Sequence, residues 1–92
     1  MGPITTIETA LATVGTMSQA RADVTAQIAA MTPADAEAVR AEAARRMRSA
    51  QADYSALSDR SRTERGLRDQ VEAARRAVEA WGLVVRLAGA RR

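Results

Sequence analysis

The 92-residue sequence has no cysteine, no histidine, no lysine and no phenylalanine, and it has one tyrosine and one tryptophan. Without cysteine there is no disulfide bond and no thiolate chemistry. Without histidine the chain lacks the commonest general base and the commonest metal ligand. Paired carboxylates would need a concave site to perturb their pKa values, and a short helical chain offers little depth. We therefore expect no enzymatic activity, no cofactor and no metal site.

Long apolar runs are also lacking. No segment approaches the roughly 20 apolar residues that span a bilayer. The N-terminus, Met1-Gly2-Pro3, has no basic region ahead of an apolar run, so no signal peptide is expected. A cytoplasmic protein without membrane contact is the default expectation. Although 47% of the residues are hydrophobic, many are alanines, which bury little surface. A lone monomer should be marginally stable, which favours an oligomer or a partner surface.

All fourteen basic residues are arginines, and with eleven acidic residues they give a net charge of +3. Codon bias in a GC-rich genome would produce the same excess of arginine and alanine. The distribution of charge is more informative. Residues 1–39 hold one arginine and four acidic residues, a net of −3, and residues 40–92 hold thirteen arginines and seven acidic residues, a net of +6. This asymmetry suits contact with a charged partner, or head-to-tail contact between subunits.

Apolar residues at helical spacing predict an all-α chain with helices at about residues 5–30, 33–57 and 62–87 and a basic tail at 88–92. The third helix has the clearest pattern, because its apolar residues recur at spacings of four and three on one helical face and include the single tryptophan. These residues are Leu67, Val71, Ala74, Val78, Trp81 and Val85.

Local start signals support these boundaries. Thr32-Pro33-Ala34-Asp35 combines an N-cap threonine, a proline at the first helical position and an acid at the positive end of the helix dipole. The segments Thr5-Thr6-Ile7-Glu8 and Ser61-Arg62-Thr63-Glu64 each fit a capping box. Gly66 lies early in the third predicted helix, unless that helix begins after it. Residues 58–66 should form a short loop, with a small β-hairpin as the alternative.

The short break at Thr32-Pro33 favours antiparallel packing of the first two helices. The third helix then folds back onto them, or pairs with a neighbouring subunit. The expected architecture is a single domain of residues 1–92, either a three-helix bundle or an extended helical hairpin with a third helix.

One set of apolar residues is a candidate contact with another subunit or a partner. Trp81 is either a core residue of the bundle or the anchor of an intersubunit contact. The residues after it make this end of the helix apolar nearly all round, so a second partner surface is expected there. The predicted contact consists of Tyr54, Trp81, Leu83, Val84 and Val85.

The arginines form the second set. Most have an acid three or four residues away, which indicates a solvated face. The predicted pairs are Arg45 and Arg46 with Glu42, Arg65 with Asp69, Arg75 with Glu79, and Arg76 with Glu72. The arginines without such a partner are Arg48, Arg60, Arg62, Arg86, Arg91 and Arg92.

Arg60 and Arg62 share a loop, and Arg91 and Arg92 share the tail. These two clusters are the candidate contacts to phosphate or to an acidic protein surface. No helix-turn-helix, zinc-finger or aromatic stacking pattern supports sequence-specific binding of nucleic acid. Any DNA contact should therefore be non-specific.

The segment from Tyr54 to Trp81, YSALSDRSRTERGLRDQVEAARRAVEAW, is similar to a pattern in small bacteriophage head-completion and head–tail joining proteins of the lambda head-completion type. The resemblance covers about a third of the chain. The matching residues are Tyr54, Asp59, Arg60, Ser61, Thr63, Arg65, Leu67 and Val71. The resemblance implies a neck protein that assembles as a ring under the portal vertex and joins capsid to tail, with basic segments facing portal or DNA.

The chain departs from that family in two places. The family has a β-hairpin between two helices, whereas Arg62 and Glu64 stand here where strand-forming side chains would be expected. The chain also carries an additional N-terminal helix. A virion or neck component of a phage from a GC-rich host therefore fits better than that particular fold.

The expected function is a structural virion protein that oligomerises and connects the head to the tail. Its expected partners are further copies of itself, arranged as a ring, together with portal or tail proteins and non-specific DNA. Its expected location is the virion, after assembly in the host cytoplasm. Two alternatives remain: a nucleic-acid-associated helical module for packaging or regulation, and a small helical bundle that binds a partner protein.

Overall fold

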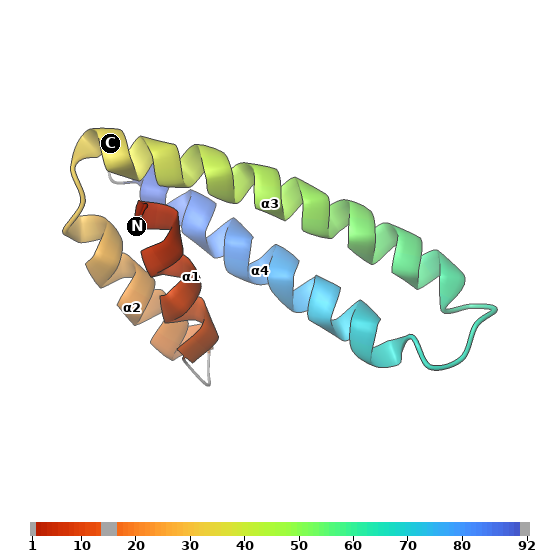
Figure 1. The fold of residues 1–92 in the computed structure, drawn as a ribbon. Helices are drawn as coiled ribbons and strands as arrows, with labels where there is room; N and C mark the ends of the chain where they lie inside the picture. Colours follow the sequence, from red (N-terminus) through yellow and green to blue (C-terminus); the bar gives the residue numbers. More distant parts are fainter. Residues whose placement is uncertain (1, 14–16, 91–92) are drawn as a thin grey trace.

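The computed structural model of the chain describes residues 2–13 and 17–90. These residues form four α-helices, α1 (Pro3–Thr13), α2 (Met17–Ala29), α3 (Pro33–Arg60) and α4 (Arg68–Ala90) (Figure 1). The described residues include no strand. The all-α prediction is therefore confirmed, and the β-hairpin alternative for residues 58–66 is wrong.

The helices form two antiparallel hairpins of unequal length. The long α3–α4 hairpin gives the molecule its length of 47 Å, against 24 and 23 Å in the other directions. The shorter α1–α2 hairpin packs against one end of it, with α1 in contact with α3 and α2 in contact with α4, and α3 and α4 continue beyond it (Figure 1). We call residues 48–80 the arm. The opposite end of the molecule, where all four helices meet, is called the bundle end.

The single helix predicted for residues 5–30 is wrong, because α1 ends at Thr13 and α2 begins at Met17. Gly15 lies outside the described residues. Glycine and threonine have lower helix propensity than alanine, so ending a helix in this part of the sequence costs little free energy. Two shorter helices place apolar residues from both halves against one core, and this packing decides the outcome.

The start of α1 also differs from the prediction. The helix begins at Pro3, where the fixed φ of proline suits the first helical position. The Thr5 N–H donates to the Gly2 carbonyl at 3.1 Å, so Thr5 lies inside the first turn. The capping box predicted at Thr5-Thr6-Ile7-Glu8 is therefore not the start of the helix.

The start of α3 is confirmed in detail. The Asp35 N–H donates to the Thr32 hydroxyl at 3.1 Å, and Pro33 is the first helical residue. The helix continues to Arg60, three residues beyond the predicted end at 57.

The link between α3 and α4 corrects the second capping box. Ser61 is the C-cap of α3, since its N–H donates to the Leu57 carbonyl at 2.9 Å and its hydroxyl donates to the Ser58 carbonyl at 2.8 Å. It does not begin the next helix, which starts at Arg68. Gly66 has φ +87°, a left-handed conformation that no α-helix contains. The predicted alternative, a helix that begins after Gly66, is the correct one.

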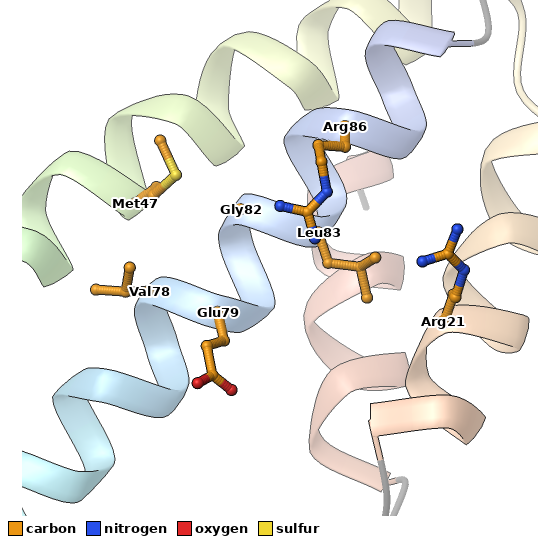
Figure 2. Close-up of a pocket in the computed structure, with 7 residues that line it drawn as sticks. All are labelled: Arg21, Met47, Val78, Glu79, Gly82, Leu83 and Arg86. Atoms are coloured by element: carbon orange, nitrogen blue, oxygen red, sulfur yellow. The ribbon is translucent and has the colours of Figure 1, made fainter.

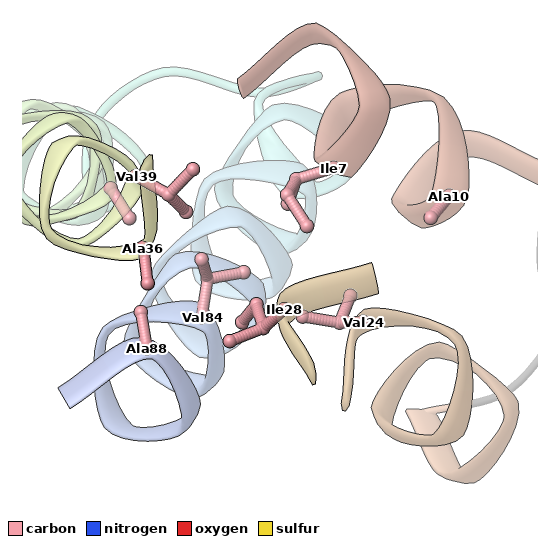
Figure 3. Close-up of a cluster of buried hydrophobic side chains, with 9 residues drawn as sticks. Ile7, Ala10, Val24, Ile28, Ala36, Val39, Val84 and Ala88 are labelled. Atoms are coloured by element: carbon pink, nitrogen blue, oxygen red, sulfur yellow. The ribbon is translucent and has the colours of Figure 1, made fainter. Parts of the chain in front are cut away.

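The hydrophobic core lies at the bundle end, and all four helices contribute to it (Figure 3). Several of its members are alanines of α3 and α4, whose small side chains allow close approach of the two helices. Its fully buried branched side chains, Ile7, Val24, Val39 and Val84, come one from each helix. The core residues are Ile7, Ala10, Val24, Ile28, Ala36, Val39, Ala43, Val84 and Ala88.

The arm is almost without a core. Between Arg48 and Ala80 the only buried residues are Ala50 and Leu67. Of the six residues on the predicted apolar face of the last helix, Leu67 is buried and the other five are half-buried. Two helices paired side by side cover only the side that each turns to the other, so these apolar side chains stay partly open.

Candidate interaction surfaces

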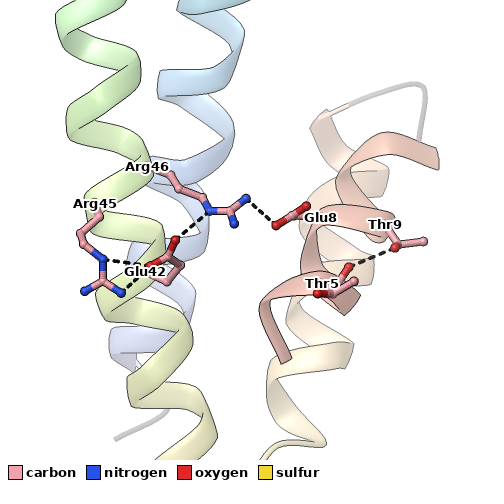
Figure 4. Close-up of polar contacts among 6 residues, drawn as sticks. All are labelled: Thr5, Glu8, Thr9, Glu42, Arg45 and Arg46. Atoms are coloured by element: carbon pink, nitrogen blue, oxygen red, sulfur yellow. Dashed lines mark hydrogen bonds and ion pairs between the residues drawn. The ribbon is translucent and has the colours of Figure 1, made fainter. Parts of the chain in front are cut away.

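Trp81 belongs to the bundle and is half-buried against the core. The guanidinium of Arg46 lies 5.0 Å from the centre of its ring, a cation–π distance. The same arginine reaches Glu8 of α1, with Nη1 2.5 Å from Oε1, and Glu42 of its own helix, with Nε 3.2 Å from Oε1 (Figure 4). Arg46 therefore connects α3 to both α1 and α4.

Two glutamates are held ionised by arginines on their own helices. Hydrogen bonds from Arg45 and Arg46 lower the pKa of Glu42, and the hydrogen bond from Arg75 lowers the pKa of Glu72. The pKa of Arg75 is raised by its hydrogen bond to Glu72 and by the charges of Glu72 and Glu79. Both glutamates are half-buried at the surface of their helices, and their geometry indicates ion pairs that support the helices.

The five residues of the predicted partner contact do not form one surface. Leu83 and Val84 are 3% and 0% exposed, so the expectation that they form an uncovered apolar surface is wrong. The α1–α2 hairpin covers both side chains. The apolar pattern of residues 62–87 does not reveal this contact, because it depends on the packing of another part of the chain. Val85 is half-buried against the same core, as Trp81 is. Tyr54, at 36% exposure, lies apart from them on the arm.

The predicted arginine clusters are also divided. Arg60 was predicted to lack an acidic partner, but its Nη2 lies 2.9 Å from Glu64 Oε2. Arg62 is exposed in the turn and makes no ion pair with a described residue. Arg91 and Arg92 lie outside the described residues. Of the two arginines predicted to act together in this turn, one is therefore paired and the other makes no ion pair with a described residue.

The other predicted ion pairs are mostly confirmed. Glu42 pairs with Arg45 and Arg46, Arg75 with Glu79, and Arg76 with Glu72. Among the described residues no ion pair joins Arg65 to Asp69. Local spacing predicted these pairs well, but not the pair between Arg46 and Glu8, which depends on the packing of α1.

The structure contains a surface pocket that the sequence did not predict. It has a volume of about 470 Å³ and lies where α2 meets the α3–α4 hairpin (Figure 2). Its floor is apolar, and its rim carries one arginine from α2 and one from α4. The lining residues are Arg21, Met47, Val78, Glu79, Gly82, Leu83 and Arg86.

This pocket continues along the arm. A second hollow of about 370 Å³ shares Val78 and Glu79 with the first and extends to Gln51, Tyr54, Ser55 and Arg75. We call the two together the α2-side groove. A separate hollow of about 520 Å³ on the arm is lined by Asp53, Ala56, Leu57, Arg60, Gln70, Ala73 and Ala74, and we call it the alanine face.

No protein-family model, curated protein or solved structure matches this chain. The described residues contain no cluster of acidic residues that could hold a metal ion. None of the described helices combines the length and the apolar character that crossing a membrane requires. The fold defines a small helical bundle with a projecting two-helix arm, and its surfaces are the basis for any functional assignment.

Proposed function

We propose that this protein is a structural assembly subunit that works by self-association through its arm, and that its setting is the neck of a bacteriophage head. The observation that carries the proposal is the composition of the arm, where apolar residues recur at helical spacing and only Ala50 and Leu67 are buried. Burial of apolar surface contributes about 25 cal/mol per Å². A further helix packed along the arm would gain this contribution, which the single chain leaves unused.

The alanine face is the best surface for such packing. Ala56, Ala73 and Ala74 present little side-chain bulk, so a helix from another copy could approach closely. Leu57 lies beside them and is half-buried. This arrangement favours association of arms into a larger helical bundle, the kind of contact that a ring of subunits requires.

Sedimentation velocity and native mass spectrometry over a range of protein concentrations test self-association. The wild-type protein should form a defined multimer. Ala73→Glu should shift it to monomer, because Ala73 is exposed on the arm and a glutamate there blocks packing at little cost to folding. The matched control is Ala22→Glu, which makes the same change at an exposed position of α2 and should leave the multimer intact. A wild-type protein that stays monomeric at every concentration refutes the proposal.

The phage setting rests on the resemblance of residues 54–81 to head-completion and head–tail joining proteins. It is tested separately, by the genes that flank this one and by co-sedimentation with the corresponding portal and tail proteins. Portal, capsid or tail genes beside it would support the setting. Unrelated genes and no co-sedimentation would oppose it, even if the protein self-associates.

Binding to nucleic acid has less support as the function. Arg60 forms an ion pair with Glu64. Arg62, the other member of the predicted cluster in the turn, makes no ion pair with a described residue. Duplex binding that falls steeply with salt, and less steeply after Arg62→Ala, would favour this alternative.

A further inference from the structure

The α2-side groove has a floor shaped by a missing side chain. Met47, Val78 and Leu83 supply apolar surface, and Gly82 leaves room between them. A Cβ placed on Gly82 would lie 3.4 Å from Met47 Sδ and 3.8 Å from Arg86 Nη1. The absence of a Cβ at Gly82 therefore leaves the space between Met47 and Arg86 open, and both side chains lie near this glycine in Figure 2.

The rim of the groove carries two arginines whose charge is not compensated. Arg21 of α2 and Arg86 of α4 are distant in sequence, and the fold brings their side chains to the same pocket (Figure 2). Neither guanidinium makes an ion pair or hydrogen bond with another described residue. The one acid in the lining, Glu79, is already paired with Arg75. The charged side chains of the pocket that make no ion pair with a described residue are therefore the two arginines, and both are positive.

The length of the groove indicates what kind of ligand fits. It runs beside α4 from Arg75 to Arg86, which corresponds to about 16 Å at 1.5 Å per residue. An apolar floor of this length, parallel to two helices, matches the way an amphipathic helix lies in a groove. The free charges are confined to the end at Arg21 and Arg86.

The described helices of this chain do not supply such a ligand from a second copy. α1 and α2 have already buried their apolar residues Ile7, Val24 and Ile28 in their own core, and α3 and α4 carry no net negative charge that would match the two arginines of the rim. We propose that the α2-side groove binds an acidic amphipathic helix of a different protein. Its apolar residues lie on Met47 and Val78, with the buried Leu83 beneath them, and its carboxylates accept hydrogen bonds from Arg21 and Arg86.

The proposal does not rest on self-association, because the alanine face is a different surface. The probe is a fluorescein-labelled amphipathic peptide with leucines at i, i+3, i+4 and i+7 and glutamates between them. Fluorescence anisotropy measures its binding to the full chain. A second peptide with lysines in place of the glutamates tests whether the groove recognises negative charge.

Binding of the glutamate peptide should weaken about tenfold in Arg21→Glu and in Arg86→Glu, since each loses a charge-assisted hydrogen bond. The matched control is Arg62→Glu, which makes the same change of net charge in the turn and should keep wild-type affinity. Gly82→Ala should also weaken binding several-fold while leaving the charge unchanged. Ala73→Glu should keep binding even where self-association is lost.

Four results would overturn the proposal. The first is equal binding of the glutamate and lysine peptides. The second is an equal loss of affinity in Arg21→Glu, Arg86→Glu and Arg62→Glu, which would indicate general attraction between opposite charges. The third is no binding of the glutamate peptide to a chain that circular dichroism shows to be folded. If Arg21→Glu dissociates the multimer, the groove is occupied by a second copy and the proposed partner is wrong.

Discussion

Arg46 adds polar contacts between the two hairpins to the hydrophobic core that all four helices share. Its guanidinium lies over the ring of Trp81 in α4 and pairs with Glu8 in α1 and Glu42 in α3. Its side chain is 35% exposed, so each ion pair contributes modestly. The cation–π contact adds about 0.5–1 kcal/mol. Arg46 matters because these interactions join three helices.

Arg46→Ala should lower the free energy of unfolding by about 1 kcal/mol, the combined size of one cation–π contact and partly exposed ion pairs. Urea unfolding followed by circular dichroism and by Trp81 fluorescence measures this. Arg45→Ala is the matched control, because Arg45 also pairs with Glu42 but is 61% exposed. It should cost less than about 0.5 kcal/mol. Equal losses in the two variants would show that the contacts to α1 and α4 contribute nothing.

Between elements, the turn from α3 to α4 depends on one backbone conformation. Gly66 has φ +87°, and no atom would lie within 4 Å of a Cβ added there. Gly66→Ala should therefore cost about 1 kcal/mol through backbone strain alone, without a steric clash. Gly66→Asn should cost less, because asparagine tolerates positive φ better. The two variants are compared by urea unfolding. If alanine is as stable as glycine, the turn has another conformation.

Which elements the sequence predicts depends on the range of the interaction that determines them. The N-cap at Thr32 and the ion pairs around Glu42 and Glu72 depend on residues within four positions, and the prediction is correct for them. The break between α1 and α2 is decided by packing against α3 and α4. The Ser61-Arg62-Thr63-Glu64 segment fits a helix start, but it follows a helix that continues to Arg60.

The surfaces were harder to predict than the helices for the same reason. Leu83 and Val84 read as open apolar positions until α1 and α2 are known to cover them. The α2-side groove joins Arg21 to Arg86, and no local pattern connects residues so far apart. Gly82 was the available signal, because a glycine within a strong helical pattern often marks a close approach or a hollow.

At the scale of the whole molecule, stability should be uneven from one end to the other. The bundle end contains nearly all of the buried apolar residues, and the arm contains Ala50 and Leu67 alone. Local opening is easiest where few apolar contacts hold the structure. The arm should therefore open without the bundle end, unless another subunit covers it.

Hydrogen exchange measured by mass spectrometry tests this gradient. In the Ala73→Glu variant, arm amides near Leu57 and Val71 should exchange faster than amides near Val39 and Val84, because the arm opens at a lower free energy than global unfolding. In the wild-type protein, at concentrations where it forms multimers, the arm should become protected and the bundle end should change little. Equal protection of both ends in the monomeric variant would show that the two-helix arm is stable by itself, and the main physical reason for its self-association would be lost.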